Sequence, residues 1–245
     1  MSSEQENLAE ILAQRGYVLR EKPKSNSPTL GEEHDDPIRN FQTFYSLPET
    51  GQIDDETKAV LIASRCGVPD PRRGIKWLAQ SRRWQKRNLT ISIENGVRDV
   101  PIERIQVLIA HAAGLWNEAA NGRFAIAPIN TDGDIKVSFQ SGHHGDAWPF
   151  SGPGGVLAHA FHAQFPERPL AGQIHFDLSE NWSFSELCPP DSKDFLSVAI
   201  HEIGHALGLD HVGTKKSVMY SNYNGVQRVL FDLDYAMIYN LYYDL

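Results

Sequence analysis

The 245-residue sequence lacks any run of about 18 apolar residues, the length that a membrane-spanning helix requires. Residues 1–20 also lack the basic start and apolar middle of a secretory signal. Cysteine is scarce: Cys66 and Cys188 can pair, but two are too few for a disulfide framework. The sequence also has no excess of positive charge, since its formal net charge is -8. This disfavours nucleic acid as the main partner.

What is present describes a globular protein. The hydrophobic fraction of 41% and the charged fraction of 22% are typical of folded domains, and the length suits one ordinary domain plus a small one. The excess of carboxylates is compatible with calcium sites, although an ordinary solubilising surface explains most of it.

The first part of the chain is expected to be a small all-α unit. Apolar spacing and acidic helix starts predict three short helices, over 5–19, 38–47 and 54–64, with a polar loop over 21–37. Residues 71–88, rich in arginine and lysine, are expected to form an exposed linker. Its basic pairs, Arg72-Arg73 and Arg82-Arg83, either suit a processing protease or are ordinary solvated charge.

The second part mixes strands and helices and is predicted to be an α+β domain. Strands are expected over 89–94, 124–128, 134–140 and 173–177, with an irregular stretch before the last of them. Helices are expected over 101–121, from a cap at Asp191 or Ser192 to about Leu207, and over 231–243.

Three histidines and a glutamate gather in HEIGHALGLDH, residues 201–211. On a helix His201 and His205 share one face, and Gly208 lets the chain turn back with His211. Three neutral imidazoles are typical ligands of a catalytic zinc, which keeps one position for water. Glu202 beside them can take the proton of that water and pass it to a leaving amine. The pattern therefore predicts metal-assisted hydrolysis of an amide.

HEIGHALGLDH followed by SVMY (217–220) resembles the metzincin metalloproteases, in which Met219 would form the floor under the zinc. SRCGVPD (64–70) is similar to the propeptide signature of the matrix metalloproteinases, or matrixins. A thiolate binds zinc strongly, so Cys66 can take the place of the water and keep the enzyme latent. Arg65 and Asp70 can pair across this loop and hold its shape.

The resemblance implies a fold and a domain order. FQTFYSLPETGQIDDETKAVL (41–61) resembles the peptidoglycan-binding-like propeptide of the matrixins. The expected order is a helical propeptide (1–70), an activation linker (71–88) and a zincin-like catalytic domain (89–245) with a mixed twisted sheet and three helices. Because the chain ends after the last predicted helix, no hemopexin domain is expected.

A second cluster is similar to the matrixin segment that binds a structural zinc and calcium. The resemblance assigns four ligands to the zinc, namely His144, Asp146, His159 and His175. It assigns calcium to oxygens of the loop 151–156 and two carboxylates, namely Ser151, Gly152, Gly154, Val156, Asp177 and Glu180. Asp134 is expected to serve a possible second calcium.

Substrate handling is predicted from the same resemblance. The strand around Val156–Ala158 is expected to be an exposed edge on which an extended peptide adds as a strand, with Leu157 and Ala158 against it. Tyr223 would line the specificity pocket. Ser197, being small, would leave that pocket deep and apolar.

The leading hypothesis is thus a latent zinc endopeptidase that acts on proteins or peptides as a monomer and is activated by another protease. The resemblance implies an extracellular or pericellular location, as in the family, despite the missing signal. The alternatives are a non-catalytic zinc-fold binding module and a protease of another metzincin subfamily. Intact Glu202 argues against the binding module. Other histidines are expected to be ordinary surface or core residues, namely His34, His111, His143 and His162.

Overall fold

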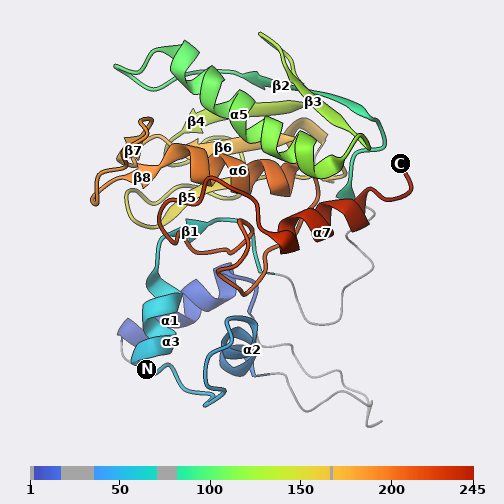
Figure 1. The fold of residues 1–245 in the computed structure, drawn as a ribbon. Helices are drawn as coiled ribbons and strands as arrows, with labels where there is room; N and C mark the ends of the chain where they lie inside the picture. Colours follow the sequence, from blue (N-terminus) through green and yellow to red (C-terminus); the bar gives the residue numbers. More distant parts are fainter. Residues whose placement is uncertain (1–2, 18–35, 71–81, 166–167) are drawn as a thin grey trace.

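The structure is a computed structural model that describes residues 3–17, 36–70, 82–165 and 168–245. In Figure 1 the N-terminal helices form a separate layer, drawn in blue and cyan, below a sheet that is flanked by longer helices. Outside the described residues fall His34, the Arg72-Arg73 pair and most of the predicted loop 21–37. Within the described residues, no helix combines the length and the apolar character needed to cross a membrane.

Three helices make the N-terminal layer: α1 (Ser3–Gln14), α2 (Pro37–Phe44) and α3 (Asp55–Ile62). Carboxylates cap two of them, because Asp36 accepts from the first amides of α2 and Asp54 accepts from Thr57 N in α3. All three are shorter than predicted. Positive φ angles at Gly16 (96°) and Ser46 (56°) mark the turns just after α1 and α2.

A small apolar core holds this layer together and reaches into the rest of the molecule. Its buried members are Leu8, Leu12, Phe41, Tyr45, Leu61 and Tyr220. Tyr220 belongs to the C-terminal half of the chain, so the N-terminal layer is packed directly on it.

The main sheet has six strands in the order β1-β5-β6-β4-β2-β3. These strands are β1 (Arg65–Cys66), β2 (Asn88–Ile93), β3 (Ala125–Pro128), β4 (Ile135–Gln140), β5 (Val156–Ala160) and β6 (Gln173–Asp177). The β5–β6 pair is antiparallel and every other pair is parallel. Two short strands, β7 (Trp182–Ser183) and β8 (Lys193–Asp194), form a separate pair, and a 3-10 turn covers Arg168–Leu170.

Three helices complete the C-terminal part: α5 (Ile102–Ala120), α6 (Phe195–Ala206) and α7 (Asp232–Leu241). Helices α5 and α6 pack against each other and on one face of the sheet, while α7 packs on α5 (Figure 1). Trp116 lies fully buried between α5 and α6, and its indole N–H donates to Ile200 O at 2.9 Å. Every residue of α6 is buried, so this helix is the centre of the core.

The predicted mixed α+β sheet with three helices is confirmed, but three sequence-based expectations about this part are wrong. Strand β5 lies inside the stretch that the local pattern predicted as irregular, where the resemblance alone placed a strand around Val156–Ala158. Helix α6 is capped by Asp194, whose side chain accepts from Ser197 N at 2.9 Å, and not by Asp191 or Ser192.

The third correction concerns the linker, because residues 82–84 are packed on the C-terminal part, whereas residues 85–88 are exposed as expected. Arg83 donates to Leu241 O at 2.8 Å, and Trp84 Nε1 donates to Ala206 O at 3.0 Å. Arg82 pairs with Asp210. The basic pair Arg82-Arg83 is therefore bonded to the C-terminal part of the molecule.

Candidate metal centre and active site

Helix α6 and the turn after it bring His201, His205 and His211 together. Their Nε2 atoms converge, at 3.0 Å between His201 and His205 and 3.2 Å between His201 and His211. Gly208, with φ of 107°, makes the turn that a residue with a side chain would adopt only with strain. The Cys66 sulfur lies within 4.8 Å of all three ligand nitrogens.

Oxygen acceptors fix the orientation of each imidazole. His201 Nδ1 donates to Val218 O at 2.6 Å, and His205 Nδ1 donates to Leu209 O at 2.7 Å. His211 Nδ1 donates to the Asp70 carboxylate at 2.9 Å. Because each Nδ1 holds its proton against an oxygen, the three Nε2 lone pairs face one another. That arrangement is repulsive without a cation and suits zinc well.

The electrostatic environment keeps these ligands neutral. Burial, together with the neighbouring imidazole of His211, lowers the pKa of His201 to about 3. Burial also lowers the pKa of His205 and of His211. Burial raises the pKa of the Cys66 thiol, and Glu202 raises it further, so the sulfur needs a nearby cation to become a thiolate.

Glu202 is fully buried beside the cluster. Among the described residues, neither of its carboxylate oxygens has a hydrogen-bond partner. Burial raises its pKa to about 8, although Cys66 and Arg65 act in the opposite direction. A buried carboxylate without donors is costly in a purely structural role, and such a group is suited to accept a proton.

The turn that contains Met219 closes the floor of the centre. Met219 is fully buried and packs against Gly204 of α6, where any side chain would collide with its sulfur. Asp234 holds the turn, because its carboxylate accepts from Val218 N at 3.1 Å and from Phe231 N at 2.8 Å. The sequence analysis missed Asp234; its position in the acidic first turn of α7 was the available signal.

A second cluster joins His144, Asp146, His159 and His175. The Asp146 Oδ2 atom lies 2.9 Å from a nitrogen of each histidine. The antiparallel register sets His159 directly opposite His175, with 3.2 Å between their facing nitrogens. Burial lowers the pKa of His175 to about 4 and also lowers the pKa of His159, so both strand imidazoles are neutral beside the carboxylate. Three histidines and one carboxylate are a donor set that fits a closed zinc site.

The segment assigned to calcium is only partly assembled. Glu180 accepts from Gly154 N at 2.6 Å, and Gly152 and Gly154 have positive φ angles that curve the loop around it. Asp177 is fully buried, and its Oδ2 atom has no hydrogen-bond partner among the described residues. A buried, unpaired carboxylate oxygen next to a curved loop fits a cation.

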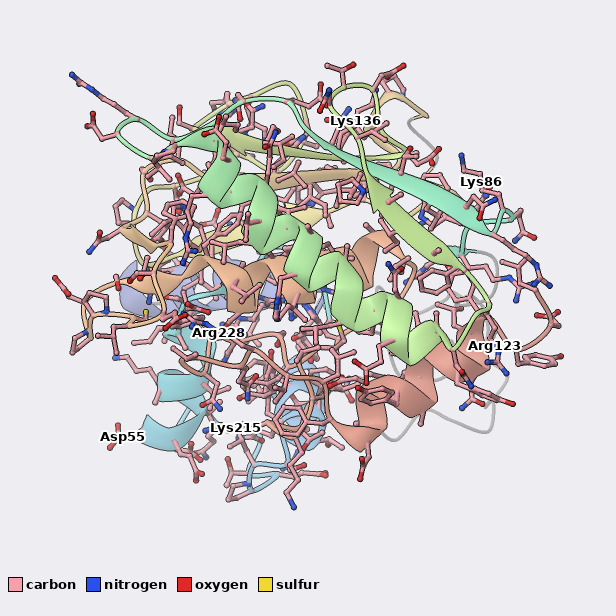
Figure 2. The ribbon with its side chains drawn as sticks, turned by 45° about the horizontal axis from the view of Figure 1, so that its top comes forward. Asp55, Lys86, Arg123, Lys136, Lys215 and Arg228 are labelled. Carbon is pink, nitrogen blue, oxygen red and sulfur yellow. The ribbon has the colours of Figure 1, made fainter. Side chains whose placement is uncertain are left out.

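Asp134, the residue expected to serve a second calcium, has hydrogen-bond and ion-pair partners in the structure. Its Oδ2 atom accepts from Thr90 N at 2.8 Å, and its Oδ1 atom lies 2.6 Å from Lys86 Nζ. The ammonium group neutralises this carboxylate in the structure, and a second calcium at Asp134 stays a prediction. Lys86 extends from the start of β2, where it is labelled in Figure 2.

The strand edge expected to receive a peptide is already paired in the structure. Strand β1 lies parallel to β5, with Gly67 N donating to Ala158 O at 2.7 Å. On its other side Cys66 N donates to Ser221 O at 3.0 Å, and Tyr223 N donates to Ser64 O at 2.8 Å. Leu157 and Ala158 are consequently buried. The loop shape is held by an Arg65–Asp70 ion pair of 3.1 Å.

Two remaining points of the sequence analysis concern the cleft and the cysteines. The cavity that Ser197 lines has a volume of about 40 Å³ while residues 64–67 occupy the cleft, so a deep, apolar pocket in the cleared cleft stays a prediction. Cys66 and Cys188 do not pair, and Cys188 lies near Ser192 Oγ at 3.4 Å.

The geometry of the site agrees with comparisons with known proteins. Residues 83–243 match the family model for the matrixin peptidases. The chain therefore belongs to the matrixin family, a family of metalloendopeptidases for which zinc is implied.

Individual relatives match most of this chain. Matrilysin of Rattus norvegicus is 36% identical over 210 residues, which is 84% of this chain and 76% of that protein. Matrix metalloproteinase-C of Caenorhabditis elegans is 38% identical over 185 residues, or 74% of this chain and 31% of that protein. Macrophage metalloelastase of Rattus norvegicus is 35% identical over 220 residues, which is 90% of this chain and 44% of that protein. The chain thus spans less than half the length of the latter two relatives.

Proposed function

We propose that this protein is a zinc endopeptidase that hydrolyses peptide bonds in proteins and is made in a latent form. The observation that carries the proposal is the convergence of three Nε2 lone pairs and one sulfur beside the unpartnered carboxylate of Glu202. In this proposal His201, His205 and His211 hold the catalytic zinc. A zinc ion there would supply a Lewis acid that lowers the pKa of water to about 7 and polarises the peptide carbonyl.

The residues of the chain supply the rest of the chemistry. Glu202 accepts the proton of the attacking water on a carboxylate oxygen and delivers it to the leaving amine. A pKa raised by burial suits both halves of this transfer, since the group must hold the proton between the two steps. The hydrogen bonds to Val218 O and Leu209 O keep His201 and His205 oriented while substrate enters.

Latency is proposed to rest on Cys66 and the segment around it. The thiol lies where water would need to enter, and the backbone of residues 64–67 fills the cleft between β5 and residues 221–223. Removing the segment would clear both. We propose residues 1–70 as the propeptide and 89–245 as the catalytic domain, with processing by an activating protease upstream of Arg82, because Arg82-Arg83 is bonded to the catalytic part.

The second histidine cluster is proposed to hold a structural zinc, with His144, Asp146, His159 and His175 as ligands. Calcium is proposed at the loop 151–156 with Asp177 and Glu180, supported by the unpaired Asp177 oxygen. We further propose a monomer that works in the extracellular or pericellular space, as the resemblance to matrixins implies.

The decisive experiment measures hydrolysis of a fluorogenic peptide library by the zinc-loaded chain before and after controlled proteolytic removal of the N-terminal part. Activity is expected only after removal. Glu202→Ala should lower kcat by about a thousandfold or more while zinc content stays unchanged, because the variant loses the proton acceptor and keeps all three imidazoles. Zinc-loaded, processed protein that binds peptides without cleaving any would instead identify a binding module.

A further inference from the structure

Helix α6 supplies two of the three clustered histidines, and the last carbonyls at its C-terminal end need partners from outside the helix. In the turn that follows, Leu209 N donates to Gly204 O at 3.0 Å. Gly208 N donates to His205 O at 2.8 Å. The turn thus satisfies two of these carbonyls, and side chains from distant parts of the chain satisfy the next two.

The two side-chain donors are an indole that precedes β2 and a phenol that follows α7. Trp84 Nε1 donates to Ala206 O at 3.0 Å. Tyr242 OH donates to Leu207 O at 2.8 Å and accepts from Trp84 N at 3.2 Å, so the two donors form one network. Because Tyr242 is fully buried, removal of its hydroxyl would leave a carbonyl without this donor, which costs free energy. The end of α6 is therefore held by residues from both ends of the C-terminal part.

The turn that these donors hold also orients the histidine cluster. His205 Nδ1 donates to Leu209 O at 2.7 Å, and the chain reaches His211 two residues later. The turn is packed closely, since a Cβ atom on Gly208 would lie 3.2 Å from the backbone of residues 82–83. A metal-binding histidine depends on the acceptor of its other nitrogen, and loss of such an outer partner typically costs about 10–100-fold in metal affinity or activity. A shift of this turn would move both the acceptor of one histidine and the position of another.

We propose that Trp84 and Tyr242 are positioning residues of the zinc centre. By bonding the last carbonyls of α6 they fix the turn that orients His205 and places His211. The inference rests on the proposed zinc endopeptidase function and adds to it two residues that contact neither the metal nor the substrate. It also requires the processed protein to keep Trp84, which agrees with processing upstream of Arg82.

The test measures how tightly the cluster of His201, His205 and His211 holds a metal in the full-length, unprocessed chain. Cobalt is used in place of zinc, because a Cys66 thiolate bound to cobalt gives a charge-transfer absorption band. The second histidine cluster contains no sulfur and cannot give this band. The cobalt-loaded chain is titrated with a chelator, and the loss of the band reports release from the first cluster alone.

Two variants keep an aromatic ring at each position and remove the donor, namely Trp84→Phe and Tyr242→Phe. Each is expected to release cobalt at about a tenfold lower chelator concentration than the parent, the lower end of the range for outer partners of a metal ligand. Release at the parent concentration in both variants would overturn the inference and leave the proposed function standing. A parent chain that gives no thiolate-to-cobalt band would overturn the proposed latent zinc centre and the inference with it.

Tyr235→Phe is the matched control. It also removes a tyrosine hydroxyl from the C-terminal helix region, but that hydroxyl bonds to the Glu118 side chain of α5 and not to α6. The control is expected to hold cobalt as tightly as the parent. A weakening as large as that of Tyr242→Phe would mean that the band reports general loosening of the fold, which would overturn the inference.

Hydrogen exchange in the unaltered chain decides the inference if neither variant folds. The indole N–H of Trp84 is then expected to exchange as slowly as the amides of α6, because its bond to Ala206 O persists. Exchange as fast as that of an exposed loop would overturn the inference.

Discussion

At the residue scale, the pKa values of two buried carboxylates of the site, Asp70 and Glu202, are shifted in opposite directions. Burial alone would raise the pKa of both Asp70 and Glu202. For Asp70 the ion pair with Arg65, the bond from His211 and the charge of Arg15 reverse the effect and hold its pKa below the usual range. For Glu202 the effects of Cys66 and Arg65 are smaller than that of burial, so its pKa rises to about 8. The difference follows from the partners of each group.

Asp70→Asn is expected to weaken docking of the segment that carries Cys66. The substitution leaves the buried Arg65 without its counter-charge, which typically costs about 3–5 kcal/mol. The unprocessed variant should therefore hydrolyse peptide measurably, whereas the unprocessed parent should not. Asp55→Asn, on the exposed start of α3 (labelled in Figure 2), serves as the control and should stay latent. An unprocessed Asp70→Asn variant that hydrolyses no more peptide than the unprocessed parent would contradict this role of Asp70.

The pH dependence of latency follows from the same shift. A carboxyl whose folded pKa is lowered stabilises the docked form above its ordinary pKa, and the contribution is lost only as pH falls through the lowered value. The Asp70 contribution should thus be constant between about pH 5 and 8 and decline below about pH 4. The loss of latency is measured by incubating unprocessed protein at each pH with zinc present. Its peptide hydrolysis is then assayed immediately at neutral pH. Loss of latency between pH 5 and 8 in the parent but not in Asp70→Asn would contradict the assignment.

At the scale of elements, the first helix reaches the wall of the cleft. Arg15, just after α1, is almost fully buried and donates to Asn222 Oδ1 at 3.0 Å and to Tyr45 OH at 3.0 Å. It also donates to carbonyls at the end of α3, including Leu61 O at 2.5 Å. One side chain thus joins all three N-terminal helices to the segment that holds Cys66 in place.

Arg15→Ala is expected to separate the N-terminal layer from the cleft. The change leaves several buried acceptors without a donor, at about 1–3 kcal/mol for each that water cannot reach. Limited proteolysis should remove the N-terminal part of the variant at least several-fold faster than that of the parent. Arg39→Ala is the control, because among the described residues Arg39 bonds within the N-terminal layer alone, with Thr50 O and Asp36 among its partners. Equal cleavage rates for parent and Arg15→Ala would rule out this role of Arg15.

At the scale of the whole molecule, β5 connects the parts of the proposed enzyme. It carries His159 of the second cluster, which lies opposite His175 of β6. On its other edge it pairs with β1, the strand that contains Cys66. Mutually facing imidazoles and a carboxylate have no stable packing without a positive charge, so metal binding and folding of this region are expected to be coupled.

Removal of metal should therefore affect stability as well as activity. A strong chelator is expected to abolish peptide hydrolysis and to lower the thermal midpoint, and added zinc should restore both. Asp146→Ala is expected to bind one zinc fewer per chain by metal analysis, whereas Asp244→Ala, remote from both clusters, should bind the full number. Unchanged zinc content in Asp146→Ala would show that the second cluster does not bind zinc.

Much of the fold was predictable from local patterns. The periodicity of apolar residues placed α5, β4 and β6 nearly to the residue, because each buries one face or both against the same core. Local patterns did not reveal β5, which only the resemblance to matrixins predicted around Val156–Ala158, since β5 is stabilised by pairing with β1 and β6. They also misplaced the cap of α6, because Asp191, Ser192 and Asp194 all precede that helix and all are residue types that cap helices. Only the structure shows that Asp194 accepts from Ser197 N.

The sequence alone determined the chemistry of the centre. The spacing of His201, Glu202 and His205 follows from the period of a helix, and SRCGVPD carries the thiol in a recognisable loop. Tertiary structure decided which atoms meet over long separations, such as His211 with Asp70 and Arg15 with Asn222. It also decided that residues 64–67 fill the space between β5 and residues 221–223. Side-chain size is a local property, whereas the space beside a side chain depends on which distant loop packs there.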